Sequence, residues 1–168
     1  LYPFALNLLG VPDDEGIRIS GGRLGASHAP REIRRAFYKM TPHVRFAKPN
    51  PIFDFGDLTS GADLASRHSE AERIFEKMHR PGEVAALLGG GHDYGYPAAA
   101  AFLNWCKKQK LRHRPLIVNF DAHLDVRPVT NGFSSGTPFR RLLESFHEFD
   151  LVEIGLQPQC NSQQHWRW

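Results

Sequence analysis

The sequence has little of what marks secreted, membrane-spanning or nucleic-acid-binding proteins. Its two cysteines, Cys106 and Cys160, are too few for a disulfide framework and suit a reducing compartment. No apolar run approaches the roughly 18 residues that a transmembrane helix needs. The net charge of +3 is too small to favour nucleic acid or a membrane surface as a partner. These absences predict a cytoplasmic protein that binds neither nucleic acid nor membrane.

Two kinds of amino-terminal signal are also missing. The chain begins Leu1-Tyr-Pro-Phe4, without an initiator methionine and without the basic and then apolar segments of a signal peptide. We therefore expect a trimmed or partial chain.

The glycine-rich stretch of residues 10–25 has neither a Walker motif nor G-x-G-x-x-G, so we interpret it as a tightly folded connection and not as a phosphate-binding loop.

What is present is an ordinary globular composition, with 41% hydrophobic and 23% charged residues. The length of 168 residues suits one domain, so we expect residues 1–168 to form a single domain. The densest basic run, residues 107–114, follows a predicted helix, where cations favour the helix dipole. We interpret this run as a solvated helix end.

Apolar runs and helical patterns alternate along the chain. Short apolar runs bounded by proline and glycine predict five strands, at residues 4–9, 52–55, 84–88, 116–120 and 151–156. Amphipathic spacing predicts four helices between them, at residues 30–40, 64–78, 97–107 and 138–146. The connections are long enough for parallel crossovers. We therefore expect an α/β fold with a mostly parallel sheet between two helical layers, a three-layer α/β/α sandwich.

Two of these helices have informative residues. Asp63 can cap the helix at residues 64–78, while Thr137 and Pro138 fit the cap and the first position of the last helix. His68 falls on the apolar stripe of its helix, with no carboxylate close to it in sequence. We therefore interpret His68 as a packed core histidine.

The strongest chemical signal follows the strand at residues 116–120, which we expect to be buried. Directly after this strand come Asp121, His123 and Asp125, which are metal-ligand side chains at every second position. If the extended conformation persists, these alternate side chains share one face. Because open α/β sheets bind ligands at the carboxyl ends of their strands, the motif predicts a metal site.

A second part of this site comes from the strand at residues 84–88. Three glycines follow that strand and lead into His92 and Asp93. If the two strands are neighbours, their axes lie about 4.8 Å apart, so His92 could meet Asp121 above the edge of the sheet. Carboxylates and imidazoles without thiolates suit Mn²⁺, Zn²⁺ or Fe²⁺.

The two motifs, Gly-Gly-Gly-His-Asp and Asp-Ala-His-Leu-Asp, resemble those of the ureohydrolase family, which includes arginase, agmatinase and formimidoylglutamase. Within that family, Asp125-Val-Arg-Pro128 and Ser134-Ser-Gly-Thr-Pro-Phe139 are most similar to formimidoylglutamase. Further matches at residues 22–26 and 153–157 extend the resemblance over nearly the whole chain. The resemblance implies an arginase/deacetylase-like sandwich that is incomplete at its carboxyl terminus.

The family's enzymes hold two manganese ions, which share a carboxylate and activate water for attack on an amidine or guanidine carbon. Carried over by position, the resemblance implies that His92, Asp121 and Asp125 bind one ion. It implies that the bridging Asp121 and His123 bind the other. It also implies that Asp125 passes a proton to the leaving nitrogen as a general acid–base catalyst.

The expected substrate depends on the residues after the motif. Arg127, held extended by Pro128, could capture a substrate carboxylate and would repel the cationic tail of agmatine; a surface ion pair is the alternative. Ser135 and Thr137 are candidate substrate-binding hydroxyls, and arginases have a histidine in this loop that the present chain lacks. N-formimino-L-glutamate fits best, and its cleavage in histidine degradation gives L-glutamate and formamide.

The family completes both metal sites with a later Asp-x-Asp pair, and no such pair follows Asp125. We therefore expect a fragment of a longer enzyme, homo-oligomeric when full length, whose isolated form binds metal weakly and shows no turnover. Two alternatives stay open. One is another ureohydrolase acting on a guanidino acid, and the other is a catalytically inactive member that serves as a binding or assembly subunit. A zinc deacetylase is more remote, because the double motif favours two ions.

Overall fold

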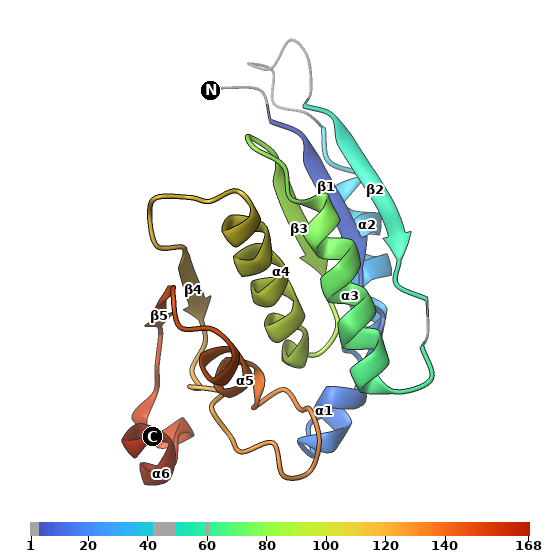
Figure 1. The fold of residues 1–168 in the computed structure, drawn as a ribbon. Helices are drawn as coiled ribbons and strands as arrows, with labels where there is room; N and C mark the ends of the chain where they lie inside the picture. Colours follow the sequence, from blue (N-terminus) through green and yellow to red (C-terminus); the bar gives the residue numbers. More distant parts are fainter. Residues whose placement is uncertain (1–3, 42–49, 60) are drawn as a thin grey trace.

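The computed structural model describes residues 4–41, 50–59 and 61–168. Strands and helices alternate along the chain as the sequence predicts, and all five expected strands are present (Figure 1). The strands are β1 (Leu6–Gly10), β2 (Ile52–Asp57), β3 (Val84–Leu88), β4 (Leu116–Phe120) and β5 (Asp150–Ile154).

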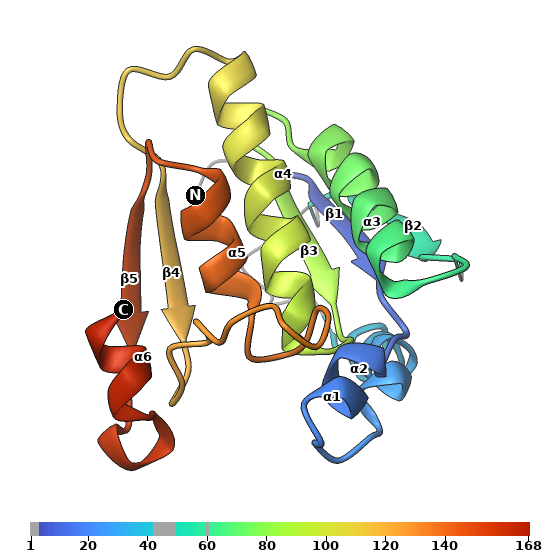
Figure 2. The same ribbon diagram turned by 60° about the horizontal axis from the view of Figure 1, so that its bottom comes forward.

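The strands form two parallel sheets, with the orders β2-β1-β3 and β4-β5. The condition under which the sequence brought His92 to Asp121, that β3 and β4 are neighbours in one sheet, is therefore not met in the described residues, because each is an edge strand of its own sheet. In Figure 2 the arrows of β1, β3, β4 and β5 nevertheless point to the same end of the molecule. The carboxyl ends of the two sheets can therefore contribute to one site.

The α-helices are α1 (Glu15–Ile19), α2 (Ala29–Phe37), α3 (Leu64–Met78), α4 (Gly95–Lys108), α5 (Pro138–Ser145) and α6 (Gln163–Arg167). Four of these α-helices, α2 to α5, correspond to the predicted helices, whereas α1 and α6 were not predicted. Single 3₁₀ turns are η1 (Ala26–His28), η2 (His92–Tyr94) and η3 (Pro158–Cys160). The predicted cap of α3 is confirmed, since the Asp63 carboxylate accepts a 2.7 Å hydrogen bond from the Ser66 amide. None of the helices in the described ranges is long and apolar enough to cross a membrane.

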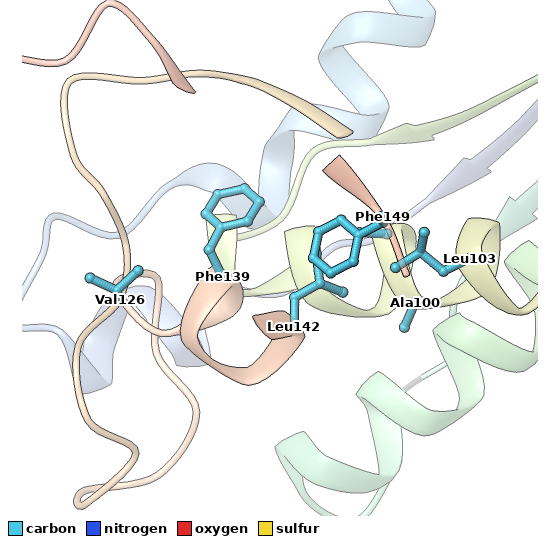
Figure 3. Close-up of a cluster of buried hydrophobic side chains, with 7 residues drawn as sticks. Ala100, Leu103, Val126, Phe139, Leu142 and Phe149 are labelled. Carbon is cyan, nitrogen blue, oxygen red and sulfur yellow. The ribbon is translucent and has the colours of Figure 1, made fainter. Parts of the chain in front are cut away.

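Helix α4 joins the two sheets through the core. Its Ala101 packs with Leu9 of β1 and Phe75 of α3, in the cluster that covers the three-stranded sheet. From the same helix, Ala100 and Leu103 pack into a second cluster, with Phe139 and Leu142 of α5 among others (Figure 3). In Figures 1 and 2, α4 lies between the two sheets, while α2 lies behind the three-stranded sheet in Figure 1. The core thus fixes how the two sets of strand ends face one another.

The start of α5 differs from the prediction in its capping. Thr137 occupies the N-cap position and Pro138 the first position, but the Thr137 hydroxyl instead bonds both backbone groups of Ser134. The carbonyl of Asp125 accepts hydrogen bonds from the amides of Phe139 (3.2 Å) and Arg140 (3.4 Å). The helix is therefore capped by the backbone of a predicted metal ligand.

The expectation that β4 is a buried strand is wrong for three of its five residues. Ile117 packs against the cluster beneath α5, while Leu116, Val118 and Phe120 point to the other face and are exposed, Phe120 by 76%. Successive residues of a strand face opposite sides of its sheet. In the described part of the chain, helices cover one side of the β4–β5 sheet.

Candidate metal centre

A glycine turn delivers His92 to the carboxyl end of β3. Gly89 and Gly90 have left-handed backbone angles, with φ of 70° and 81°. A methyl group on Gly90 would lie 2.8 Å from the carbonyl oxygen of Val11, closer than such atoms pack. Glycine is therefore required for a tight turn pressed against β1, and this turn places His92 in η2.

The loop after β4 is shaped differently from the prediction. The extended conformation ends at Phe120, and the Asp121 carboxylate accepts a 2.8 Å hydrogen bond from the backbone amide of His123, a short polar turn. Asp125 has a left-handed φ of 50°, which is costly for any residue but glycine. The three side chains therefore do not share one face of an extended strand, and Asp125 is placed by a strained backbone.

His92 nevertheless meets the two predicted carboxylates. Its Nδ1 lies 2.8 Å from Oδ2 of Asp125 and 3.1 Å from Oδ2 of Asp121. One ligand atom from each of the three residues lies within 4.8 Å of the other two, and no other such group of three occurs in the described residues. His123 approaches from the opposite side, with its Nδ1 2.9 Å from Oδ1 of Asp121. The two oxygens of Asp121 thus face two different histidines, as a bridging carboxylate would.

The charges of these groups are coupled. Burial lowers the pKa of His92, but the hydrogen bond to Asp125 and the negative charges of Asp125 and Asp121 outweigh it, and the net shift is upward. Burial raises the pKa of Asp121, but hydrogen bonds from His123 and the charge of His92 outweigh it, and the net shift is downward. The site therefore favours positive charge between its carboxylates.

The donor set fits a divalent cation of hard to borderline character. His92, Asp121 and Asp125 offer one nitrogen and two oxygens without a thiolate, a set compatible with Mn²⁺. For a second ion, Asp121 and His123 offer one donor each. Asp125 is the most buried of the four, with 7% of its side chain exposed, against 46% for His123.

The predicted substrate-binding residues lie in the loop that leads to α5. The exposed Arg127 runs along Gly136, where a methyl group would lie 2.6 Å from Cδ of the arginine. The alternative for Arg127 was a surface ion pair, but Arg127 forms no ion pair with any of the described residues. The amide of Ser135 bonds the Gly16 carbonyl, and its hydroxyl is buried without a hydrogen-bond partner. The Thr137 hydroxyl is engaged within the loop, so a substrate contact by Thr137 stays a prediction.

Two groups near this site were not singled out from the sequence. Glu153 of β5 accepts a 2.8 Å hydrogen bond from Asn119 of β4. Burial, together with the charges of Asp125 and Asp121, raises the pKa of Glu153. The other group is Asp93, whose carboxylate lies 2.7 Å from the ring of His68. Both pairings join residues that are distant in sequence, so the sequence motifs that contain Asp93 and Glu153 did not reveal their partners.

Parallel strands whose carboxyl ends bring one imidazole and two carboxylates together define an α/β protein with a candidate site for a divalent cation. The chain belongs to the arginase family, whose model matches residues 4–167. This confirms the resemblance of the sequence to the ureohydrolases and the expected fold class.

Several proteins with similar sequences are formimidoylglutamases. The sequence is 34% identical to the one from Klebsiella pneumoniae (strain 342), over 98% of this chain and 51% of that protein. It is 38% identical to the one from Aeromonas salmonicida, over 93% of this chain and 49% of that protein. A Trypanosoma cruzi formiminoglutamase solved with Mn²⁺ superposes with a TM-score of 0.82 at 29% identity, covering 96% of this chain and 56% of that one. This chain thus spans about half the length of the relatives it matches.

Proposed function

We propose that the full-length protein is a manganese-dependent hydrolase that cleaves N-formimino-L-glutamate to L-glutamate and formamide. The observation that carries this proposal is the convergence of His92, Asp121 and Asp125 from two separate sheets. The similarity to formimidoylglutamases over nearly the whole chain supports the choice of substrate. The Mn²⁺ in the similar Trypanosoma cruzi enzyme supports the choice of metal.

Four residues would bind metal, and one of them would also transfer a proton. His92, Asp121 and Asp125 would hold one ion, and Asp121 and His123 would contribute to a second. When bound, such a pair of ions polarises the substrate and lowers the pKa of water. Asp125 is largely shielded from solvent, and its Oδ2 lies 2.8 Å from Nδ1 of His92. We assign to this carboxylate the transfer of a proton to the leaving nitrogen.

The loop after Asp125 would select the substrate. Arg127 has no ion pair with a described residue, so its guanidinium is free to bind a substrate carboxylate in a bidentate manner. Ser135 has a buried hydroxyl without a partner, which a polar substrate group could satisfy. Thr137 would act by holding the loop through Ser134.

The test uses the full-length protein with Mn²⁺ and N-formimino-L-glutamate. We expect release of formamide and glutamate, loss of both on chelation, and recovery with added Mn²⁺. Release of urea from a guanidino acid, without formamide release, would favour the alternative ureohydrolase. Absence of both activities in a protein that still binds Mn²⁺ would favour the inactive binding or assembly subunit.

The proposal also covers the activity of residues 1–168 alone, the location of the protein and its assembly. Residues 1–168 alone should bind Mn²⁺ weakly and show no turnover, because the second ion finds two donors among them. Both cysteines are free thiols in the structure, which supports the proposed cytoplasmic location. A single domain for residues 1–168 and a homo-oligomer for the full-length protein stay predictions.

A further inference from the structure

A network of three charged or polar side chains, of which His68 and Asp93 are buried and Arg141 is half-buried, lies next to the turn that bears His92. His68 of α3 and Asp93 of η2 are 2% and 1% exposed at their side chains, and His68 Nε2 lies 2.7 Å from Asp93 Oδ2. On the other side of the ring, His68 Nδ1 lies 2.9 Å from Nη1 of Arg141 in α5. The Arg141–His68–Asp93 network therefore joins three elements that are far apart in sequence.

The chemistry of the partners fixes the direction of these hydrogen bonds. A guanidinium has donors and no acceptor, so Nδ1 of His68 must accept from Arg141. The ring proton then lies on Nε2 and is donated to Asp93. Burial lowers the pKa of the Arg141 guanidinium to about 10, which leaves it protonated at neutral pH. The network is thus an ordered series of donors that ends on the Asp93 carboxylate.

Packing leaves this network little freedom to rearrange. The His68 ring stacks on Phe133, with centroids 5.5 Å apart and planes at 6°. The Arg141 guanidinium lies between Phe133 and Tyr96, 3.5 and 3.7 Å from their ring centroids. Because Phe133 belongs to the loop between Asp125 and α5, the same contacts also hold that loop.

The backbone around Asp93 is shaped to fit its carboxylate. A methyl group on Gly16 would lie 2.1 Å from Oδ1 of Asp93, and one on Gly91 would lie 2.2 Å from the same atom. Either side chain would displace the carboxylate. This buried oxygen has no hydrogen-bond partner in the described residues, so the bond from His68 is what fixes the Asp93 side chain.

We propose that the Arg141–His68–Asp93 network positions the ligands of the metal ion that His92, Asp121 and Asp125 would hold. Asp93 directly follows His92 in η2, and Arg141 lies on the helix whose first turn is capped by the Asp125 carbonyl. The network thus ties the turn that bears one ligand to the helix that anchors another. It holds the 2.8 Å spacing between His92 Nδ1 and Asp125 Oδ2. This inference rests on the proposed metal site and not on the identity of the substrate.

The test compares two histidine variants in the full-length protein. His68→Phe keeps an aromatic ring and removes both hydrogen bonds. His79→Phe is the matched control, since His79 at the end of α3 also packs among aromatic rings, against Phe75, Phe102 and Trp105. We expect His68→Phe to raise the dissociation constant of the tighter Mn²⁺ about 10- to 100-fold, as loss of a supporting hydrogen bond does. His79→Phe should leave it within about twofold of wild type.

Mn²⁺ affinity is read from the electron paramagnetic resonance signal of free Mn²⁺, without reference to turnover. Wild-type protein that binds no Mn²⁺ would refute the proposed function. If His68→Phe bound Mn²⁺ as tightly as wild-type protein does, only this inference would be refuted. It would also be refuted if His79→Phe lost as much Mn²⁺ affinity as His68→Phe.

A second measurement covers the case in which His68→Phe does not fold. In wild-type protein, nitrogen chemical shifts of the His68 ring should show a neutral imidazole protonated at Nε2, and a proton on Nδ1 would overturn the network. Arg141→Met should weaken Mn²⁺ binding, and Arg141→Lys should restore part of it, because lysine still donates to Nδ1. Equal Mn²⁺ binding by these two variants would also overturn the proposal.

Discussion

The turn after β3 and the loop after β4 supply similar ligands, but they are held in different ways. Behind His92, the pair of His68 and Asp93 is buried, so its hydrogen bond has no competition from solvent. In the loop after β4, Asp121 and His123 bond each other and remain open to solvent. Partners that are buried are costly to separate, whereas exposed pairs contribute little to stability.

Asp125 links the two regions. Its side chain is shielded and faces His92, while its carbonyl caps α5, the helix that also bears Arg141. The site is therefore preformed on the side of His92 and Asp125. Its fixed part is the pair of His92 and Asp125. The buried pair of His68 and Asp93 supports the turn that bears His92, and the contact of the Asp125 carbonyl with α5 supports Asp125. The His123 side is supported by a single carboxylate.

The largest effect should follow from removing this link. Asp125→Asn keeps the shape of the side chain, but it removes a charged ligand and the proposed proton carrier. We expect formamide release by the full-length protein to fall by at least about 10³-fold. Glu144→Gln, on the exposed face of α5, is the control and should keep nearly full activity. An Asp125→Asn protein within tenfold of wild type would contradict the assigned role.

A large loss of stability should follow from opening the core beneath α5. Leu142 is fully buried in the cluster of Figure 3, so Leu142→Ala should lower the free energy of unfolding by about 2–5 kcal/mol. Leu111→Ala makes the same change at an exposed leucine and should cost less than about 0.5 kcal/mol. Denaturant titration measures both values. Equal losses would mean that α5 is not anchored by this cluster.

A moderate and pH-dependent effect is expected beneath the turn after β3, where Asp13 binds Arg67 and Tyr94. Burial raises the pKa of Asp13, but hydrogen bonds from Tyr94, the Glu15 amide and Arg67 outweigh it, so the pKa is lowered. The stability from Asp13 is thus present above its unfolded pKa of about 3.9 and is lost as pH falls through the folded value.

Asp13→Asn should therefore lower the free energy of unfolding by about 1.5–3 kcal/mol at neutral pH. The difference from wild type should shrink as pH falls below about 4. Asp150→Asn, which loses an exposed pair with Arg114, should show a small difference at every pH. A difference for Asp13→Asn that grows toward low pH would show that the sign is wrong.

The sequence motifs predicted that His92 would meet Asp121, and the family resemblance added Asp125, although the assumed geometry was wrong. Both motifs follow parallel strands, and the carboxyl ends of such strands lie at one end of the molecule whether or not the strands are paired. The left-handed backbone of Asp125 could not be predicted, because nothing local demands it in a residue with a side chain. In the structure this backbone is accompanied by hydrogen bonds from the first turn of α5 to the Asp125 carbonyl, a contact between separate segments of the chain.

The role of His68 was only half predictable. Helical spacing correctly placed its ring in the core, as interpreted from the sequence. Its partners lie 25 residues away at Asp93 and 73 residues away at Arg141, and no periodic pattern relates them. A buried histidine needs hydrogen-bond partners, and that requirement is the signal that could have prompted a search for a distant carboxylate.

The smallest effect on stability should come from replacing His123. This replacement tests directly whether the turn after β3 and the loop after β4 differ in how they hold their ligands. His123→Asn removes an exposed ring whose partner in the described residues is Asp121, so unfolding should change by less than about 1 kcal/mol. The number of Mn²⁺ bound by the full-length protein should nevertheless fall from two to one, since the second ion loses its imidazole. Metal analysis after gel filtration gives this number. If His123→Asn instead lost both ions while His92→Asn lost one, the preformed part of the site would lie in the loop after β4.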